Sequence, residues 1–203
     1  HLERMRDYSQ ILAEYLAEHG PDAAQINEHF LTDFYRSTPL HDIGKVGISD
    51  AILLKPGRLT SDEFEIMKKH AVIGADMLQE TAQHSACGTF LQMAADIARY
   101  HHERFDGSGY PDGLRGHDIP LTARIVAVAD VFDAITSKRV YKDRIPADEA
   151  KEIIVQESGK HFDPVVVAAF TECYDEFLAV RWVERKDGVR DRQAAPQMAG
   201  VGA

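Results

Sequence analysis

Histidine and aspartate side chains fall at several positions where ordinary folding does not require them. They are His41, Asp42, His70, His101, His102 and Asp130. Asp130 lies in "RIVAVADVFDAI", a predicted helix that is apolar on most of its sides. A buried carboxylate without a partner is strongly unfavourable, so Asp130 must be paired, protonated or bound to a metal.

The side chains of this set offer only imidazole nitrogen and carboxylate oxygen, a mixture that suits Fe, Mn or Zn. Mg or Ca would prefer oxygen ligands alone, and the lack of cysteine in the set argues against a structural zinc site. One aspartate can bridge two cations, and a metal pair activates water and holds both oxygens of a phosphoryl displacement. The set therefore indicates either a metal-dependent phosphohydrolase or a group of purely structural polar residues.

Spacing gives one of these histidines, His70, an ordinary structural interpretation as well. One predicted stripe faces the core and consists of Ile66, His70, Ile73 and Met77. Taken alone, His70 would be a hydrogen-bonded core histidine. The adjacent His101 and His102 cannot point the same way on a regular helix, but at a helix end both could converge on one cation.

The elements that position these residues are all predicted to be helices, and no segment has the pattern of a strand. The predicted ranges are about 5–20, 22–43, 60–80, 88–104, 120–138, 147–158 and 164–180. Thr60 and Glu63 form a capping box at the start of one helix, and Asp163 caps the last. The predicted fold class is all-α.

Length and composition limit the remaining choices. A chain of 203 residues has room for one domain with a sizeable core, expected at 1–180, followed by a flexible tail at 181–203. The formal charge of −10, from 33 acidic and 23 basic residues, argues against nucleic-acid binding. No apolar run approaches a membrane span, and the two cysteines form no CxxC pair, which favours a cytoplasmic protein. Because the chain begins at His1 rather than Met, we expect an N-terminally truncated fragment.

The sequence resembles the HD-GYP family of cyclic di-GMP phosphodiesterases in an ordered set of motifs. The two main ones are "HDIGK" at 41–45 and "HHERFDGSGYPDG" at 101–113. Supporting matches are "HLERM" at 1–5, "ILLKPGRLTSDEF" at 52–64, "MKKHAVIGADML" at 67–78, "RIVAVADVFDAITSKRVYK" at 124–142 and "HFDPVVVAAF" at 161–170. The resemblance covers about residues 1–178 and implies an HD-domain helical bundle around a central metal site.

The resemblance also implies roles for individual residues. One metal is expected on His1, His41, Asp42 and Asp130, and a second on Asp42, His70, His101 and His102. Asp42 would bridge the metals, and Lys45 would approach the scissile phosphate as a second catalytic residue. Substrate binding is expected at Gly109, Tyr110, Asp133, Arg139 and Lys142. For Asp133, the alternatives are a guanine contact, orientation of a ligand, or a helix salt bridge. Fe or Mn is the expected metal, and some family members hold a third metal on a glutamate that precedes the position of His1.

The implied activity is hydrolysis of cyclic di-GMP to pGpG, with GMP as a further product, in bacterial second-messenger signalling. The alternative is a catalytically silent module that senses cyclic di-GMP or docks a GGDEF-domain cyclase. Silent members usually lose part of the HD or HH pair, whereas this chain keeps each one that can be read. A mononucleotide-specific HD nucleotidase would not need the GYP loop. An N-terminal receiver or sensor domain and a homodimer are further partners that the resemblance allows.

Overall fold

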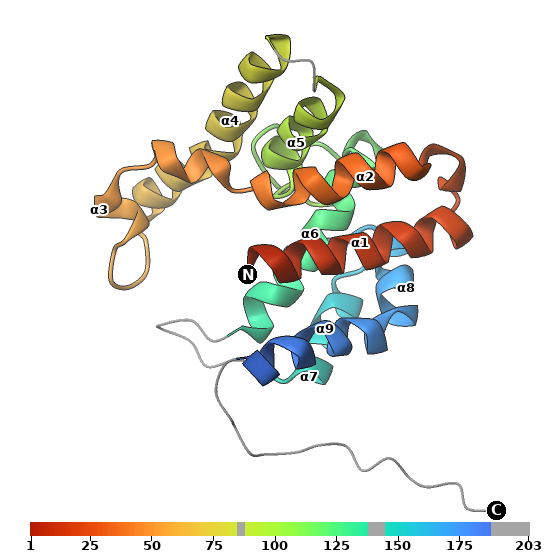
Figure 1. The fold of residues 1–203 in the computed structure, drawn as a ribbon. Coiled ribbons are helices and arrows are strands. Elements are labelled where there is room, and N and C mark those ends of the chain that lie inside the picture. Colours follow the sequence, from red (N-terminus) through yellow and green to blue (C-terminus); the bar gives the residue numbers. More distant parts are fainter. Residues whose placement is uncertain (85–87, 138–144, 188–203) are drawn as a thin grey trace, which may run out of the picture.

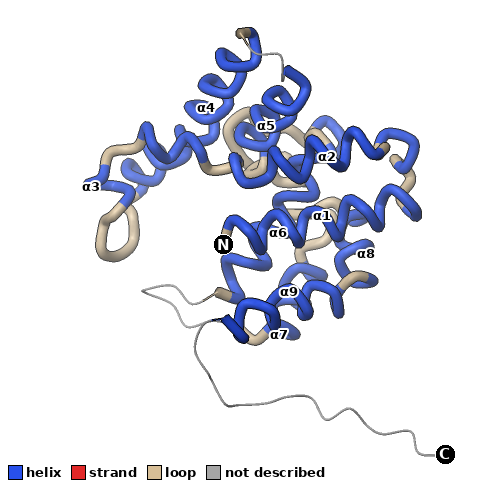
Figure 2. The backbone as a smooth tube through the Cα atoms, in the orientation of Figure 1, coloured by secondary structure: helices blue, strands red, loops and turns tan. Residues whose placement is uncertain are grey.

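The structure is a computed structural model that describes residues 1–84, 88–137 and 145–187, and within these ranges every regular element is a helix (Figure 2). The α-helices are α1 (Leu2–His19), α2 (Glu28–Ser37), α3 (Asp50–Leu53), α4 (Ser61–Gln83), α5 (Gly88–Tyr100), α6 (Leu121–Thr136), α7 (Ala147–Gln156), α8 (Pro164–Glu172) and α9 (Tyr174–Asp187). Short 3₁₀ segments are η1 (Ala23–Gln25), η2 (Thr38–Leu40), η3 (Ile43–Gly47) and η4 (Gly116–Asp118). The predicted all-α fold is confirmed.

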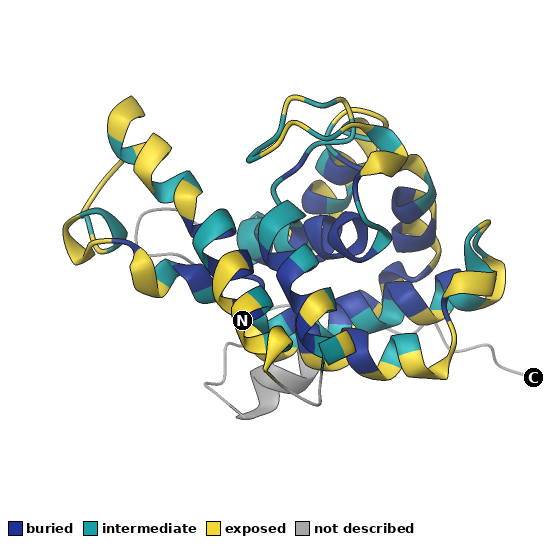
Figure 3. Cartoon of the chain, turned by 90° about the horizontal axis from the view of Figure 1, so that it is seen from above, coloured by how far each residue is buried: buried dark blue, intermediate teal, exposed yellow. Residues whose placement is uncertain are grey.

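The helices form two groups on either side of α1 and α2 (Figure 1). On one side α4 packs against α5, and η3 packs against α4. On the other side α7 and α8 pack against α6, and α1 contacts both α8 and α9. Buried residues lie in the interior and exposed ones on the outer faces of the helices (Figure 3), and α6, which contacts both α1 and α5, is buried along most of its length. Side chains from distant parts of the sequence therefore meet in the middle of the molecule.

Two hydrophobic cores hold these groups together. The larger core lies around α1, α6, α8 and α9 and includes the stacked rings of Tyr8 and Phe177. The smaller core lies between α4 and α5 and includes Leu78 and Leu91. Helix α5 belongs to both, since Ile97 faces the larger core and Ala94 faces the smaller one. The candidate site lies near this junction.

Both predicted helix caps are confirmed. Thr60 and Glu63 form the expected capping box at the start of α4, in which each side chain accepts a hydrogen bond from the other residue's backbone N–H. The carboxylate of Asp163 accepts a hydrogen bond from the backbone N–H of Val165 at the start of α8. These caps satisfy backbone donors that have no partner within the helix.

The predicted helix from 22 to 43 is wrong, because this segment is broken into shorter pieces. Asn27 caps α2 by accepting a hydrogen bond from Phe30, and the α-helix ends at Ser37. Pro39 follows within the 3₁₀ turn η2, where its missing N–H removes a donor that a continuing α-helix would use. The break frees His41 and Asp42 from regular helical geometry.

The predicted apolar stripe of α4 is also wrong, although His70 itself is buried. Ile66 is 40% exposed and Met77 is 43% exposed, so neither belongs to a core. The buried face of α4 consists of His70, Ala71, Gly74, Ala75 and Leu78. Small residues on this face allow α5 and η3 to approach α4 closely.

Two helix ends differ from the prediction. Helix α5 stops at Tyr100 rather than near 104, so His101 and His102 follow its last turn. Helix α9 continues to Asp187, whereas irregular chain was expected from Arg181 onward. The rest of the predicted tail, 188–203, lies outside the described residues. Among the described residues no helix is long and apolar enough to cross a membrane.

Candidate metal centre

The predicted metal ligands come together in two adjoining groups. One group contains His1, His41 and Asp42, and the other contains Asp42, His70, His101 and His102; within each, the ligand atoms lie within 4.8 Å of one another. Oδ1 of Asp130 lies 4.0 Å from Nε2 of His1, at the edge of the first group. Asp42 belongs to both groups, and this is the arrangement that a bridging carboxylate requires.

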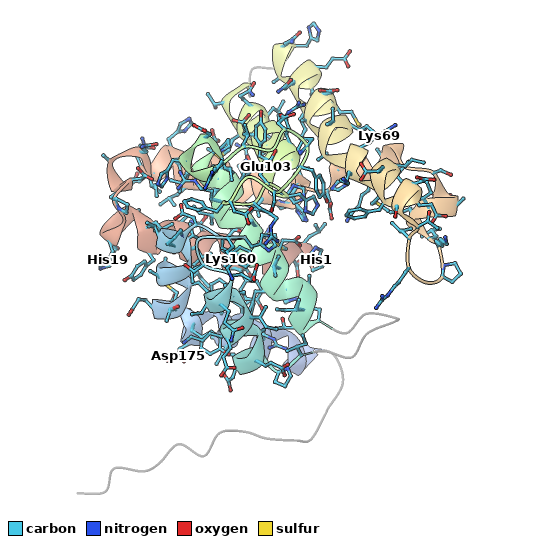
Figure 4. The ribbon with its side chains drawn as sticks, turned by 180° about the vertical axis from the view of Figure 1, so that it is seen from behind. His1, His19, Lys69, Glu103, Lys160 and Asp175 are labelled. Carbon is cyan, nitrogen blue, oxygen red and sulfur yellow. The ribbon has the colours of Figure 1, made fainter. Side chains whose placement is uncertain are left out.

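Each group draws on elements that are far apart in the sequence. His1 precedes α1, and Figure 4 shows it beside α6, the helix that carries Asp130. His70 lies in α4, while His41 lies between η2 and η3. Because α5 ends at Tyr100, the rings of His101 and His102 lie only 3.9 Å apart between centroids and converge instead of pointing to different sides.

A close backbone contact positions Asp42 against α4. A Cβ atom at Gly44 would lie 1.9 Å from the carbonyl oxygen of His70 and 2.4 Å from the backbone nitrogen of Gly74. Only glycine fits at this crossing of η3 and α4. The contact places Oδ1 of Asp42 within 3.4 Å of Nε2 of His70.

Backbone carbonyls orient three of the imidazole rings. The Nδ1 atoms lie within hydrogen-bond distance of carbonyl oxygens, with His41 paired to Thr38 at 3.0 Å, His70 to Met67 at 2.7 Å and His101 to Ile97 at 2.9 Å. Since a carbonyl only accepts, each Nδ1 carries the proton and each Nε2 keeps its lone pair. These three Nε2 atoms and Oδ1 of Asp42 are buried and have no hydrogen-bond partner in the described part of the chain. A metal would satisfy all four, so the residues fit a metal centre.

Burial keeps the imidazole rings of His101 and His102 neutral, as metal coordination requires. Burial and the neighbouring imidazoles hold the pKa of His101 well below its ordinary value. Burial, followed by the nearby imidazole of His70, lowers the pKa of His102 to about 3. Both rings are therefore neutral at pH 7, and a metal ligand must be neutral imidazole.

The pKa values of His41 and Asp42 shift in the opposite sense. Burial raises the pKa of Asp42, but contacts with His41 and Lys45 outweigh burial and bring the pKa below its ordinary value. Burial lowers the pKa of His41, but the contacts with Asp42 outweigh it and raise the pKa. The Asp42 carboxylate thus stays ionised, as a ligand of a metal cation must be.

Asp133 lies inside the protein and contacts His1. Its side chain is 2% exposed, and Oδ2 lies 2.6 Å from Nδ1 of His1. Its other oxygen accepts a hydrogen bond from Nε of Arg4 at 2.5 Å. This geometry favours the ligand-orienting role for Asp133 over the guanine contact, because both oxygens are already engaged. Arg4 was missed from the sequence, although it follows His1 closely, in the first turn of α1.

The loop after α5 is braced by its own backbone. A Cβ atom at Gly109 would lie 2.3 Å from the nitrogen of Arg104 and 2.5 Å from Cα of Glu103. The absent side chain of Gly109 thus allows close packing within the loop, and its expected role in substrate binding stays a prediction. Glu103 accepts hydrogen bonds from the backbone N–H groups of Asp112 and Gly113. Arg104 forms an ion pair with Glu157 at 3.0 Å.

This loop places Tyr110 against the cluster. The Tyr110 ring stacks on the His102 ring with centroids 4.8 Å apart and planes inclined by 28°. Lys45 also lies at the cluster, with Nζ 2.5 Å from Oδ2 of Asp42. The predicted substrate ligands Arg139 and Lys142 lie outside the described residues.

Comparison with known proteins agrees with this geometry. The family model for the HD domain matches residues 1–166. A cyclic di-GMP phosphodiesterase of Vibrio cholerae serotype O1 is 48% identical over 89% of this chain and 37% of its own length. A 3'3'-cGAMP-specific phosphodiesterase of the same organism is 40% identical over 89% of this chain and 32% of its own length. The chain thus spans about a third of the length of either relative.

A solved structure shares the fold. It is described as an HDG"Y"P protein from Bdellovibrio bacteriovorus and superimposes with a TM-score of 0.60 at 20% identity, covering 86% of this chain and 53% of its own. The helical architecture and the histidine–aspartate cluster define an all-α domain built around a candidate metal centre. The chain belongs to the HD domain family, and the resemblance of its motifs to the HD-GYP branch is confirmed.

Proposed function

We propose that this chain is the catalytic domain of a metal-dependent phosphodiesterase that hydrolyses cyclic di-GMP to pGpG, with GMP as a further product. The observation that carries the proposal is the convergence of three buried, unpartnered Nε2 atoms on Asp42. Such a set is costly to bury unless a cation binds it. The names of the relatives support a cyclic dinucleotide as the substrate.

The centre would hold two metals that share Asp42, with His1, His41 and Asp130 on one side and His70, His101 and His102 on the other. The nitrogen and oxygen donors suit Fe or Mn. When bound, such a pair lowers the pKa of water and stabilises charge on the phosphoryl oxygens. A third metal would need a ligand from the segment that precedes His1 in relatives.

The protein's own residues would orient the reactants. Asp133, held by Arg4, fixes the ring of His1, and the backbone carbonyls fix His41, His70 and His101. Tyr110 presents an aromatic face next to His102, where a base of the substrate can stack. Lys45 would leave Asp42 for the scissile phosphate and stabilise negative charge as the leaving oxygen departs.

The test is turnover by protein purified under reducing, anaerobic conditions and analysed for metal content. We expect about two Fe or Mn per chain and conversion of cyclic di-GMP to pGpG, followed over time by chromatography for the appearance of GMP. Parallel reactions with 3'3'-cGAMP measure the preference between cyclic dinucleotides. A fully metal-loaded protein that binds cyclic di-GMP tightly without hydrolysing it would instead support the silent sensor.

A further inference from the structure

An aromatic and cationic surface on α4 adjoins the candidate metal centre. Phe64 is 46% exposed, and its ring meets the Tyr110 ring edge-on with centroids 6.3 Å apart. Nζ of Lys68 lies 5.4 Å from the Phe64 centroid and 5.5 Å from the Tyr110 centroid. Since Tyr110 in turn stacks on His102, these three side chains continue outward from the cluster.

The surface has features that packing alone does not require. Phe64 belongs to neither of the two hydrophobic cores defined by the described residues. Lys68 forms an ion pair with Glu65 at 2.6 Å, but the Glu65 side chain is 66% exposed. An ion pair this exposed is weak, so Glu65 competes little with an incoming acceptor group for the ammonium of Lys68.

The negative charge of the chain indicates a role for Lys68 in binding an anionic substrate. The chain carries a formal charge of −10, and Asp42 and Asp130 lie in the centre itself. An anionic substrate therefore needs cations placed locally. Lys68 is only two positions before His70, and two aromatic rings hold its ammonium close to the loop.

We propose that Phe64, Lys68 and Tyr110 form a purine subsite for the part of the substrate that extends beyond the scissile phosphate. This inference rests on the proposed function. Because the two rings meet edge-on, a base can stack on the face of one ring and contact the other at an angle, and the ammonium contacts the O6 and N7 acceptors on the edge of a guanine. Phe64 and Lys68 then determine affinity for the nucleotide without taking part in bond cleavage.

The test compares Phe64→Leu and Lys68→Met with Lys69→Met in the metal-loaded protein. Lys69 is the exposed neighbour on the same helix (Figure 4) and serves as the matched control. Each of the first two substitutions should raise the KM for cyclic di-GMP about tenfold, as loss of one base contact would, with kcat nearly unchanged. Hydrolysis of bis(4-nitrophenyl) phosphate, which has no purine, should stay at the wild-type rate. Lys68→Arg should restore most of the affinity.

Thermal unfolding separates this role from a structural one, because Phe64→Leu and Lys68→Met should leave Tm within a degree or two of wild type. The inference is overturned if wild type hydrolyses cyclic di-GMP while both variants match Lys69→Met, or if they slow both substrates equally. A metal-loaded wild type that hydrolyses the small diester but not cyclic di-GMP would instead overturn the proposed function.

Discussion

The Nδ1 atom of His1 lies 2.6 Å from the carboxylate of Asp133, a residue near the end of α6. Arg4 completes the arrangement, because its guanidinium engages the same carboxylate and also lies 3.2 Å from the hydroxyl of Ser137. The start of α1 is thereby fixed to the helix that carries Asp130. One charged residue thus orients an imidazole and joins two helices at once.

Asp133→Asn should weaken both functions of this carboxylate. The Arg4 guanidinium would lose its buried counter-charge, so the free energy of unfolding should fall by about 3 kcal/mol. The His1 ring would lose its acceptor, so the metal on the His1 side should be depleted first. Urea unfolding of chelator-treated protein and elemental analysis measure the two effects. Asp7→Asn is the control, since Asp7 forms an exposed ion pair with Arg6; an equal effect there would contradict the prediction.

Asp42→Ala and His70→Ala should differ in metal content. Asp42 belongs to both ligand groups, whereas His70 belongs to one. Loss of Asp42 should therefore reduce both metals, and loss of His70 should leave about one metal per chain. Elemental analysis of protein purified anaerobically distinguishes the cases. Equal occupancy in the two variants would argue against Asp42 as the bridge.

Tyr110→Ala and His102→Ala should separate substrate binding from chemistry. Tyr110 stacks on His102 without belonging to either ligand group, so its removal should keep the metals and slow turnover of cyclic di-GMP. The loss should be about 1–3 kcal/mol, the usual value for one base–aromatic stack. His102→Ala should abolish hydrolysis of both cyclic di-GMP and a small diester, because it removes a ligand. If Tyr110→Ala also lost its metal, the division of roles would be wrong.

Gly44→Ala should displace Asp42 from α4. The added Cβ would overlap the backbone of His70 and Gly74, and backbone cannot give way as a side-chain tip does. We expect a loss of unfolding free energy of roughly 2–4 kcal/mol together with loss of metal. Gly88→Ala is the matched control, because among the described residues the nearest atom to its added Cβ would be the carbonyl oxygen of Ala82, 3.9 Å away. Circular dichroism melts and metal analysis of both variants measure the difference.

His161 should make the folded state less stable as pH falls. Burial, followed by the charge of Arg104, lowers its pKa to about 4. Below pH 6.5 the unfolded chain binds a proton at His161 and the folded chain does not. Protonation therefore stabilises the unfolded state, and the free energy of unfolding falls as the pH drops from 6.5 to about 4. His161→Gln should therefore reduce the drop in unfolding free energy between pH 7 and pH 5 by about 1 kcal/mol, after allowance for solvent screening. Urea titrations of chelator-treated protein test this, with the exposed His19→Gln as control.

The sequence identifies the residues that the structure brings together in the candidate metal centre, because they lie in short motifs with unusual chemistry. Adjacent His101 and His102 on a polar, glycine-rich segment have no ordinary structural explanation. The residues that hold the ligands in place were not predictable in the same way. Whether Gly44 touches Gly74 depends on how η3 crosses α4, a tertiary contact that no local pattern records.

Local signals also compete within the sequence. Asp22 and Asn27 are both good helix-capping residues, and only the structure shows that α2 starts after Asn27. The apolar spacing of Ile66 and Met77 predicts a buried stripe, yet the small residues Ala71 and Gly74 face the core instead. Close helix packing selects small side chains there, and hydrophobic periodicity does not detect that preference.

Helix α5 belongs to both hydrophobic cores, with Ile97 on one side and Ala94 on the other. The two cores therefore cannot unfold independently, because exposing either one removes packing contacts that stabilise α5. Unfolding should be cooperative across the whole described domain, without a stable half-folded form. A substitution deep in either core would then empty the metal centre as effectively as damage to a ligand.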